Sequence, residues 1–238
     1  MKYELETIPV WEAYRADGEC PVCVLEKKNE AQYLKFFLGD SVMDPDTRVE
    51  ANRKGFCVRH SDLLLEGGHK LGLALMSHTF LQQFLAKYRD MKKEEKVARA
   101  RKKTPPDWPG FIRRSLSECL FCERLAQTLD RYVYTIVYLY RKDGDFRTTF
   151  QGSKGFCLPH AARVLEMADG ELKGPVRDGF FSDLLTIEEQ RLAVLEGEID
   201  WFTQKFDYRN QDKPWGNSAD ALPRVLQKLK GHLFIDRK

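Results

Sequence analysis

The sequence predicts a mainly α-helical protein made of two tandem helical repeats that pack as one pseudo-symmetric unit. Three observations lead to this fold class. Apolar residues recur at helical spacing along most of the chain, one pair of cysteine motifs occurs twice, and a proline-rich break separates two halves. We expect the first repeat over residues 1–104, the second over 105–210, and a C-terminal loop with a closing helix over 211–238.

The expected helices follow this spacing in chain order. They cover residues 23–37, 61–65, 71–91, 125–139, 161–167, 187–206 and about 219–230. The segment 132–138 is rich in residues that favour strands, but it lies where the matching helix of the first repeat lies, so we expect a helix there as well. The charged tract 92–103 also has helical composition, and the three prolines of 104–110 end it, because proline cannot continue a helix.

The repeat is carried by two short motifs that together use every cysteine of the chain. The first motif is C-x-x-C, and its second copy begins 99 residues after the first. The second motif is G-F-C-x-x-H, and its copies are 100 residues apart. Between the two motifs lie 33 residues in the first copy and 34 in the second. The residues concerned are Cys20, Cys23, Cys57 and His60, and then Cys119, Cys122, Cys157 and His160.

Each motif contributes two side chains that can converge on one metal ion. Three thiolates and one imidazole form a common closed tetrahedral set for zinc. Each motif is expected at the start of a helix, where the helix dipole favours the thiolate form of cysteine. The simplest pairing joins the motifs within a repeat, which gives one site from Cys20, Cys23, Cys57 and His60 and another from Cys119, Cys122, Cys157 and His160. A crossed pairing, in which the C-x-x-C of one copy meets the C-x-x-H of the other, stays open.

Several chemistries fit these eight ligands. We favour two structural zinc ions, and the main alternative is two [4Fe–4S] clusters, since histidine can replace one cysteine as a cluster ligand. A thiol redox pair is a third hypothesis, although a dithiol oxidoreductase does not need the C-x-x-H partner. The fourth is a set of buried cysteines that bind nothing. Two pairs, Asp46–Arg48 and Asp145–Arg147, are expected to brace the loops or to hydrogen-bond the ligand histidines.

Composition narrows the class of protein. The 39 basic and 36 acidic residues give a formal net charge of +3, and this balance argues neither for nor against nucleic acid, since dedicated binders usually show a clear basic excess. The basic tract 92–103 is more typical of a solvated helix end, so nucleic acid is the weaker choice of partner and a protein is the stronger. The N-terminus has no signal-peptide pattern, and the longest apolar stretch, 133–140, is too short to cross a membrane. We therefore expect a cytoplasmic protein with reduced cysteines and no membrane contact.

Two stretches of the sequence, 38–48 leading into 52–60 and 206–210 followed by Trp215, resemble a family of uncharacterised bacterial proteins. That family is known mainly from anaerobic gut and clostridial lineages and shares the paired C-x-x-C and G-F-C-x-x-H motifs. The resemblance covers nearly the whole chain and implies that the motif residues are ligands. It implies no activity, because the family is a domain of unknown function, and an anaerobic setting would favour the iron–sulfur alternative.

The sequence contains no Walker loop, dinucleotide fingerprint, nucleophile elbow or H-E-x-x-H motif. The resulting hypothesis is a metal-binding helical scaffold or interaction protein. An iron–sulfur redox or sensor protein is the alternative, and an enzyme with one open metal position comes third. The sequence does not specify the oligomeric state.

Overall fold

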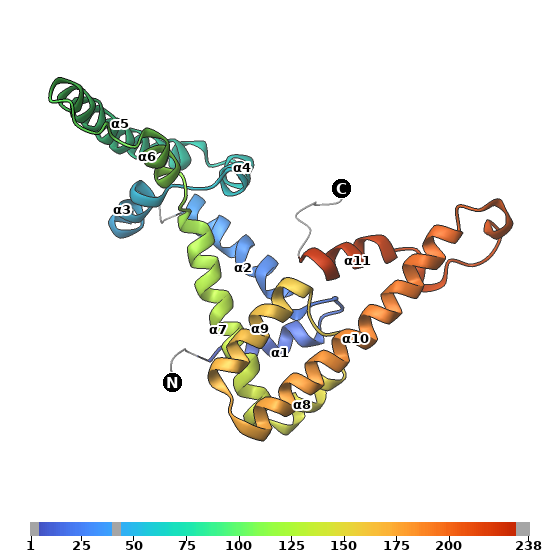
Figure 1. Cartoon of the computed structure of the whole chain (residues 1–238). Coiled ribbons are helices and arrows are strands. Elements are labelled where there is room, and N and C mark those ends of the chain that lie inside the picture. The colour runs from blue at the N-terminus through green and yellow to red at the C-terminus, as the bar shows by residue number, and fades with distance from the viewer. Residues whose placement is uncertain (1–4, 40–43, 232–238) are drawn as a thin grey trace. The chain divides into compact units, whose positions relative to one another are not determined.

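The computed structural model describes residues 5–39 and 44–231, and all regular structure within these ranges is helical (Figure 1). Residues 40–43, which form part of the family resemblance, lie outside the described ranges. No helix in the described part of the chain has the length and apolar character that a membrane crossing requires.

The chain forms two compact units. Unit 1 consists of Met1–Lys28 and Thr128–Lys238, and unit 2 consists of Asn29–Gln127. Unit 2 is therefore a continuous insertion in the sequence of unit 1, and the boundaries of the units fall inside two helices, Pro21–Leu38 (α2) and Leu120–Lys142 (α7). These units differ from the sequence repeats 1–104 and 105–210, and the pseudo-symmetric packing of the repeats stays a prediction.

Unit 1 contains most of the second half of the chain. Besides the start of α2 and most of α7, its helices are Thr7–Arg15 (α1), Gly144–Gln151 (α8), Leu158–Glu171 (α9), Gly174–Gln204 (α10) and Ala221–Lys230 (α11). Two short 3-10 turns, Tyr208–Asn210 (η2) and Gly216–Ser218 (η3), lie between α10 and α11, and α11 packs against both α9 and α10. Lys205 fixes this connection, because its ammonium group donates to the carbonyls of Asn210, Gln211 and Lys213 at 2.6–2.7 Å.

Unit 2 is built around one long helix. Its helices, besides the end of α2 and the start of α7, are Pro45–Lys54 (α3), Val58–Glu66 (α4), Lys70–Ala100 (α5) and Trp108–Ser115 (α6). Both α3 and α4 pack against α5. The rings of Phe84 on α5 and Phe111 on α6 stack at a centroid distance of 5.6 Å, which holds α6 against the long helix.

The helical class predicted from the sequence is confirmed, including the segment 132–138, which lies inside α7. The break after the charged tract is also confirmed, since α5 ends at Ala100 and α6 begins at Trp108. The start of α10 was predicted wrongly, at 187 instead of Gly174. Pro175 argued against a helix at this point of the sequence. Proline is nevertheless compatible with the first turn of a helix, because the N–H groups there have no hydrogen-bond partner within the helix.

The phenylalanine of each G-F-C motif anchors its loop in an aromatic cluster. Phe156 is fully buried in unit 1 beside Phe150, which in turn contacts Tyr140 and Phe180 at centroid distances of 5.2 Å. Phe56 lies 5.5 Å from the ring of Phe37 in unit 2. Full burial of a large ring contributes on the order of 1.5–3 kcal/mol, which applies to Phe156, whereas Phe56 is half-buried and contributes less. The ring contacts hold both loops where they carry their cysteine and histidine.

Candidate metal centres

The eight motif residues form two groups of three cysteines and one histidine. Site 1 consists of Cys20, Cys23, Cys157 and His160, and site 2 consists of Cys57, His60, Cys119 and Cys122. In each group the ligand atoms all lie within 4.8 Å of one another. The simplest pairing, within each repeat, is thus wrong, and the crossed pairing is the one that the fold adopts.

The reason for the crossing lies in the division of the chain into units. Each C-x-x-C motif is followed by a long helix, α2 or α7, that leaves the unit in which the motif lies. The first C-x-x-C therefore belongs to unit 1 together with the second C-x-x-H, and the reverse holds for unit 2. Each site lies wholly within one unit, so that the fold of that unit alone positions all four side chains.

Every motif lies at the start of a helix, as the sequence predicts. Cys57 and Cys157 are the N-cap residues of α4 and α9, whereas α2 and α7 begin directly after Cys20 and Cys119. Within each C-x-x-C turn the backbone N–H of the second cysteine points at the sulfur of the first, at 3.4 Å for Cys20 and 3.5 Å for Cys119. These donors, together with the positive end of each helix, stabilise thiolates.

In site 1 the three cysteine sulfurs lie close to the Nδ1 atom of His160. Nδ1 lies 3.5, 3.4 and 3.2 Å from the sulfurs of Cys20, Cys23 and Cys157, and the sulfurs of Cys23 and Cys157 are 3.6 Å apart. Three sulfurs and one nitrogen thus enclose a single point.

Site 2 has nearly the same dimensions. His60 Nδ1 lies 3.2, 3.5 and 3.2 Å from the sulfurs of Cys57, Cys119 and Cys122, and the sulfurs of Cys57 and Cys122 are 3.8 Å apart. The ring of Phe121 stacks on the imidazole at a centroid distance of 4.0 Å, which fixes the orientation of the ring.

Glycine is required before both G-F-C cysteines. Gly55 and Gly155 have φ values of 65° and 74°, in the left-handed region that favours glycine. A Cβ atom at Gly155 would lie 2.4 Å from Oε1 of Glu188, and one at Gly55 would lie 3.0 Å from the ring of Phe80. The glycines therefore allow both the turn into the motif and the close approach of a neighbouring helix.

Two glutamates of α2, which neither repeated motif includes, face the outer nitrogens of the ligand histidines. His60 Nε2 lies 3.4 Å from Glu30 Oε1, and His160 Nε2 lies 3.7 Å from Glu26 Oε2. A carboxylate behind a ligand histidine fixes the tautomer and makes the other nitrogen a better ligand. Asp46 and Asp145, which were expected in this role, lie instead in the first turns of α3 and α8.

Burial and neighbouring charges shift the proton affinities of the ligand groups. Burial lowers the pKa of His60, but contacts with Cys119 and Glu30 outweigh it and raise that pKa to about 9. Burial raises the pKa of Cys119, yet its hydrogen bond with His60 and backbone donors outweigh burial and bring that pKa down to about 6. In site 1, contacts with Cys20 and then Cys23 hold the pKa of Cys157 far below its usual value. The neighbouring cysteines are shifted the other way: burial and the charge of Cys119 raise the pKa of Cys122 to about 12, and contacts with Cys157 and Cys20 raise the pKa of Cys23. Each site thus stabilises the thiolate, the form of cysteine that binds metals, at one of its cysteines before any metal binds.

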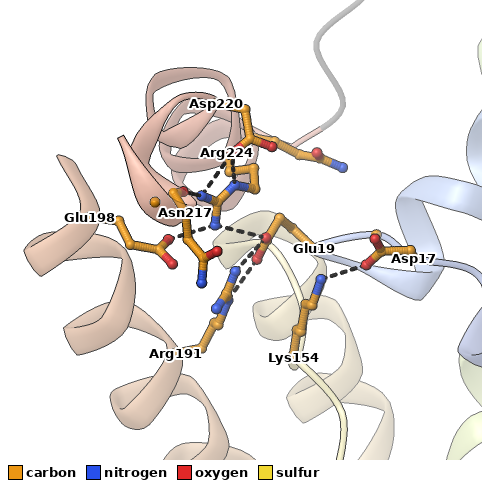
Figure 2. A pocket seen from close by; sticks show the side chains of 11 residues that line it. Asp17, Glu19, Lys154, Arg191, Glu198, Asn217, Asp220 and Arg224 are labelled. Carbon is orange, nitrogen blue, oxygen red and sulfur yellow. Dashed lines mark hydrogen bonds and ion pairs between the residues drawn. The ribbon is translucent and has the colours of Figure 1, made fainter. Parts of the chain in front are cut away.

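A network of ion pairs fixes the turn that carries Cys20 (Figure 2). The carboxylate of Glu19, the residue before Cys20, is 2% exposed and accepts two hydrogen bonds from Arg191 of α10 at 2.8 and 2.5 Å. Arg224 of α11 lies 3.7 Å from the same carboxylate and pairs with Glu198 at 2.6 Å. These side chains line a polar pocket next to the site, and α10 and α11 are thereby joined to the C-x-x-C turn.

The loop that carries Cys157 is held by a second buried ion pair. Lys228 of α11 is fully buried, and its ammonium group lies 2.7 Å from Glu188 Oε2 and donates to the carbonyl of Lys154 at 2.9 Å. Glu188 in turn accepts the backbone N–H of Phe156 at 2.6 Å. Gly231, at the end of α11, lies close enough that an added Cβ would be 3.8 Å from the Cys157 sulfur. Helix α11 thus closes over site 1.

Fold and site together define a mainly helical protein with two Cys₃His groups that could each hold a metal ion. The chain belongs to a family of unknown function, DUF6062, whose model matches residues 1–236. Neither the curated proteins nor the solved structures gave a match.

Proposed function

We propose that the protein is a zinc-binding helical scaffold in which each of two zinc ions joins the starts of two helices. Site 1 would join α2 to α9, and site 2 would join α4 to α7. The observation that carries this proposal is the spacing of the ligand atoms. The sulfur–nitrogen distances are 3.2–3.5 Å, and the sulfurs of Cys23 and Cys157 and those of Cys57 and Cys122 are 3.6 and 3.8 Å apart. Ligands at about 2.0–2.3 Å from one tetrahedral ion stand roughly 3.5–3.8 Å apart.

The same spacing argues against the iron–sulfur alternative. A [4Fe–4S] cluster takes one protein ligand on each of its irons, so its ligand atoms lie outside a cage of four metals and stand farther apart than around a single ion. A single iron would fit the same space as zinc, and metal analysis separates the two.

A closed set of four protein ligands supports a structural role rather than a catalytic one. Catalytic zinc keeps one position for water or substrate, whereas structural zinc is bound by four side chains. All four ligands of site 1 are buried, with Cys20 and Cys157 at 0% exposure and His160 at 8%. We accordingly propose a protein partner and a cytoplasmic location, where reduced cysteines persist.

The first test is the metal and acid-labile sulfide content of protein purified without oxygen and without added metal. We expect about two zinc ions per chain and no sulfide, from two four-ligand sites. Iron with matching sulfide would replace this proposal with the redox or sensor alternative. Free thiols with no metal would refute both.

The pairing of the ligands can be tested by counting the zinc retained by two quadruple variants. The variant C20A/C23A/C157A/H160A removes one crossed site, so it should keep about one zinc ion at site 2. The variant C20A/C23A/C57A/H60A removes half of each crossed site, so it should keep none. Pairing within the repeats would reverse the two results.

A further inference from the structure

The two candidate centres differ in their access to solvent although their ligand sets are the same. Cys20, Cys23 and Cys157 of site 1 are all buried. In site 2, Cys57 and Cys119 are partly exposed and Cys122 is exposed. The buried side of site 2 is the imidazole, since His60 is 1% exposed and lies under Phe121. Site 2 is therefore closed at its histidine and open at its thiolates.

The difference comes from what surrounds the two C-x-x-C turns. In site 1 the glutamate before the motif, Glu19, is buried against Arg191 and Arg224 of α10 and α11. The corresponding residue in site 2, Glu118, is exposed. The residue after Cys122 does take part in a contact, because Glu123 pairs with the buried ammonium group of Lys54. That pair fixes the start of α7 and leaves the Cys122 sulfur accessible.

Given the zinc sites proposed above, we infer that site 2 is a modification site for hydroperoxides, with Cys122 as the reacting thiolate, and that its oxidation releases the metal of site 2 alone. Oxidation of cysteine follows thiolate character and exposure, and among the six cysteines, all of which the structure describes, Cys122 is the exposed one. Metal-bound sulfur keeps thiolate character at neutral pH.

The chemistry requires two thiolates and one hydroperoxide molecule. The Cys122 sulfur attacks the peroxide, the O–O bond breaks, and a sulfenic acid forms with release of hydroxide or alkoxide. A second thiolate of site 2 then attacks the oxidised sulfur, and the hydroxide that leaves takes up a proton to form water. Cys57 is suitably placed for this step, with its sulfur 3.8 Å from that of Cys122. The two thiolates lose two electrons, the peroxide gains them, and the metal ion leaves unreduced because two of its ligands have become a disulfide.

The experiment uses the full-length zinc-loaded protein and hydrogen peroxide. Zinc content is measured first, release is followed with a chromophoric chelator, and oxidised cysteines are mapped by alkylation and mass spectrometry. We expect one zinc ion per chain to be released at least about tenfold faster than the other, with the disulfide confined to Cys57, Cys119 and Cys122. Equal release of both ions, or oxidation that begins at Cys20, Cys23 or Cys157, would overturn the inference.

Two histidine substitutions provide a matched control. Cys122→His removes the exposed thiolate and keeps four zinc ligands, so it should slow the fast phase of release. Cys23→His makes the same change at the equivalent position of site 1 and should leave the fast phase unchanged. Protein that contains no zinc before treatment would refute the proposed function instead, whereas two zinc ions that leave together would refute this inference alone.

Discussion

The buried ion pair between Lys228 and Glu188 gives the sharpest test of how unit 1 closes over site 1. Lys228 is 0% exposed, Glu188 is 7% exposed, and their charged groups are 2.7 Å apart. Lys228→Met leaves a buried carboxylate without its counter-ion, and breaking a buried pair on one side costs about 3–5 kcal/mol. We expect unit 1 to lose that much free energy of unfolding.

The double variant E188Q/K228M should lose less, because it leaves no buried charge and the glutamine oxygen can still accept the N–H of Phe156. The loss of unfolding free energy in the double variant should be clearly smaller than the sum of the losses in Glu188→Gln and Lys228→Met. Lys230→Met, an exposed lysine in the same helix, is the matched control and should change stability by less than about 0.5 kcal/mol.

Urea unfolding followed by tryptophan fluorescence measures these changes. Three of the four tryptophans, Trp11, Trp201 and Trp215, lie in unit 1, so a Trp108→Phe background makes the signal specific for that unit. A loss below about 1 kcal/mol for Lys228→Met, or strict additivity in the double variant, would refute the reasoning.

Three further predictions concern the ligands and their loops. Glu26→Gln should weaken metal binding at site 1 and Glu30→Gln at site 2, each by about 10–100-fold in a chelator competition, and a change at the opposite site would contradict the assignment. Gly155→Ala should destabilise unit 1 by at least about 1–2 kcal/mol in urea, because φ is positive and Glu188 blocks the added Cβ, whereas Gly170→Ala, with no atom within 4 Å, should not. Burial and the hydrogen bond to Asp183 raise the pKa of Tyr140 to about 12, so the stability that its hydroxyl contributes is fully present below pH 10 and is lost as the pH rises toward 12. The difference in unfolding free energy between wild type and Tyr140→Phe should shrink over that range, and a constant difference would rule this out.

The sequence was sufficient for the helical class and for the eight residues that form the two Cys₃His groups; that these residues bind metal stays a prediction. Apolar spacing and the duplicated motifs can be read from the sequence locally. Helix starts at the cysteine motifs were predictable because the positive end of a helix dipole stabilises a thiolate. The pairing was not predictable, because 33 or 34 residues separate the motifs in each repeat and either pairing could be spanned. It depends on α2 and α7 leaving the unit in which they begin, which no local pattern records.

Glu26 and Glu30 were missed for a related reason. The two carboxylates do not recur in the second repeat, because both belong to the same helix, three and seven residues after Cys23. They lie one helical turn apart on α2, and one faces a histidine in each unit. The sequence feature that could have indicated them is a pair of acidic residues at i and i+4 directly after a C-x-x-C motif, because such residues lie on the same face of a helix. Recurrence in the repeat does not predict burial either, because Glu19 and Glu118 occupy identical positions in the two copies and only Glu19 is buried.

The residues of site 2 lie, in the sequence, between those that site 1 joins. The lengths of the two loops can therefore be compared with the burial of the two sites as causes of a difference in metal release. Site 1 joins residues 134 positions apart, Cys23 and Cys157, and site 2 joins residues 65 positions apart inside that loop, Cys57 and Cys122. A doubling of loop length changes the closure entropy by only about 0.6 kcal/mol, so loop length makes the two metal links nearly equivalent. The burial of Glu19 and Lys228 does distinguish the two sites, because their ion pairs tie α10 and α11 to the loops that carry Cys20 and Cys157, and Cys157 is 0% exposed. Any large difference in metal release between the sites must therefore come from the helices that cover site 1, and a variant that loosens α11, such as Lys228→Met, should bring the two release rates closer together.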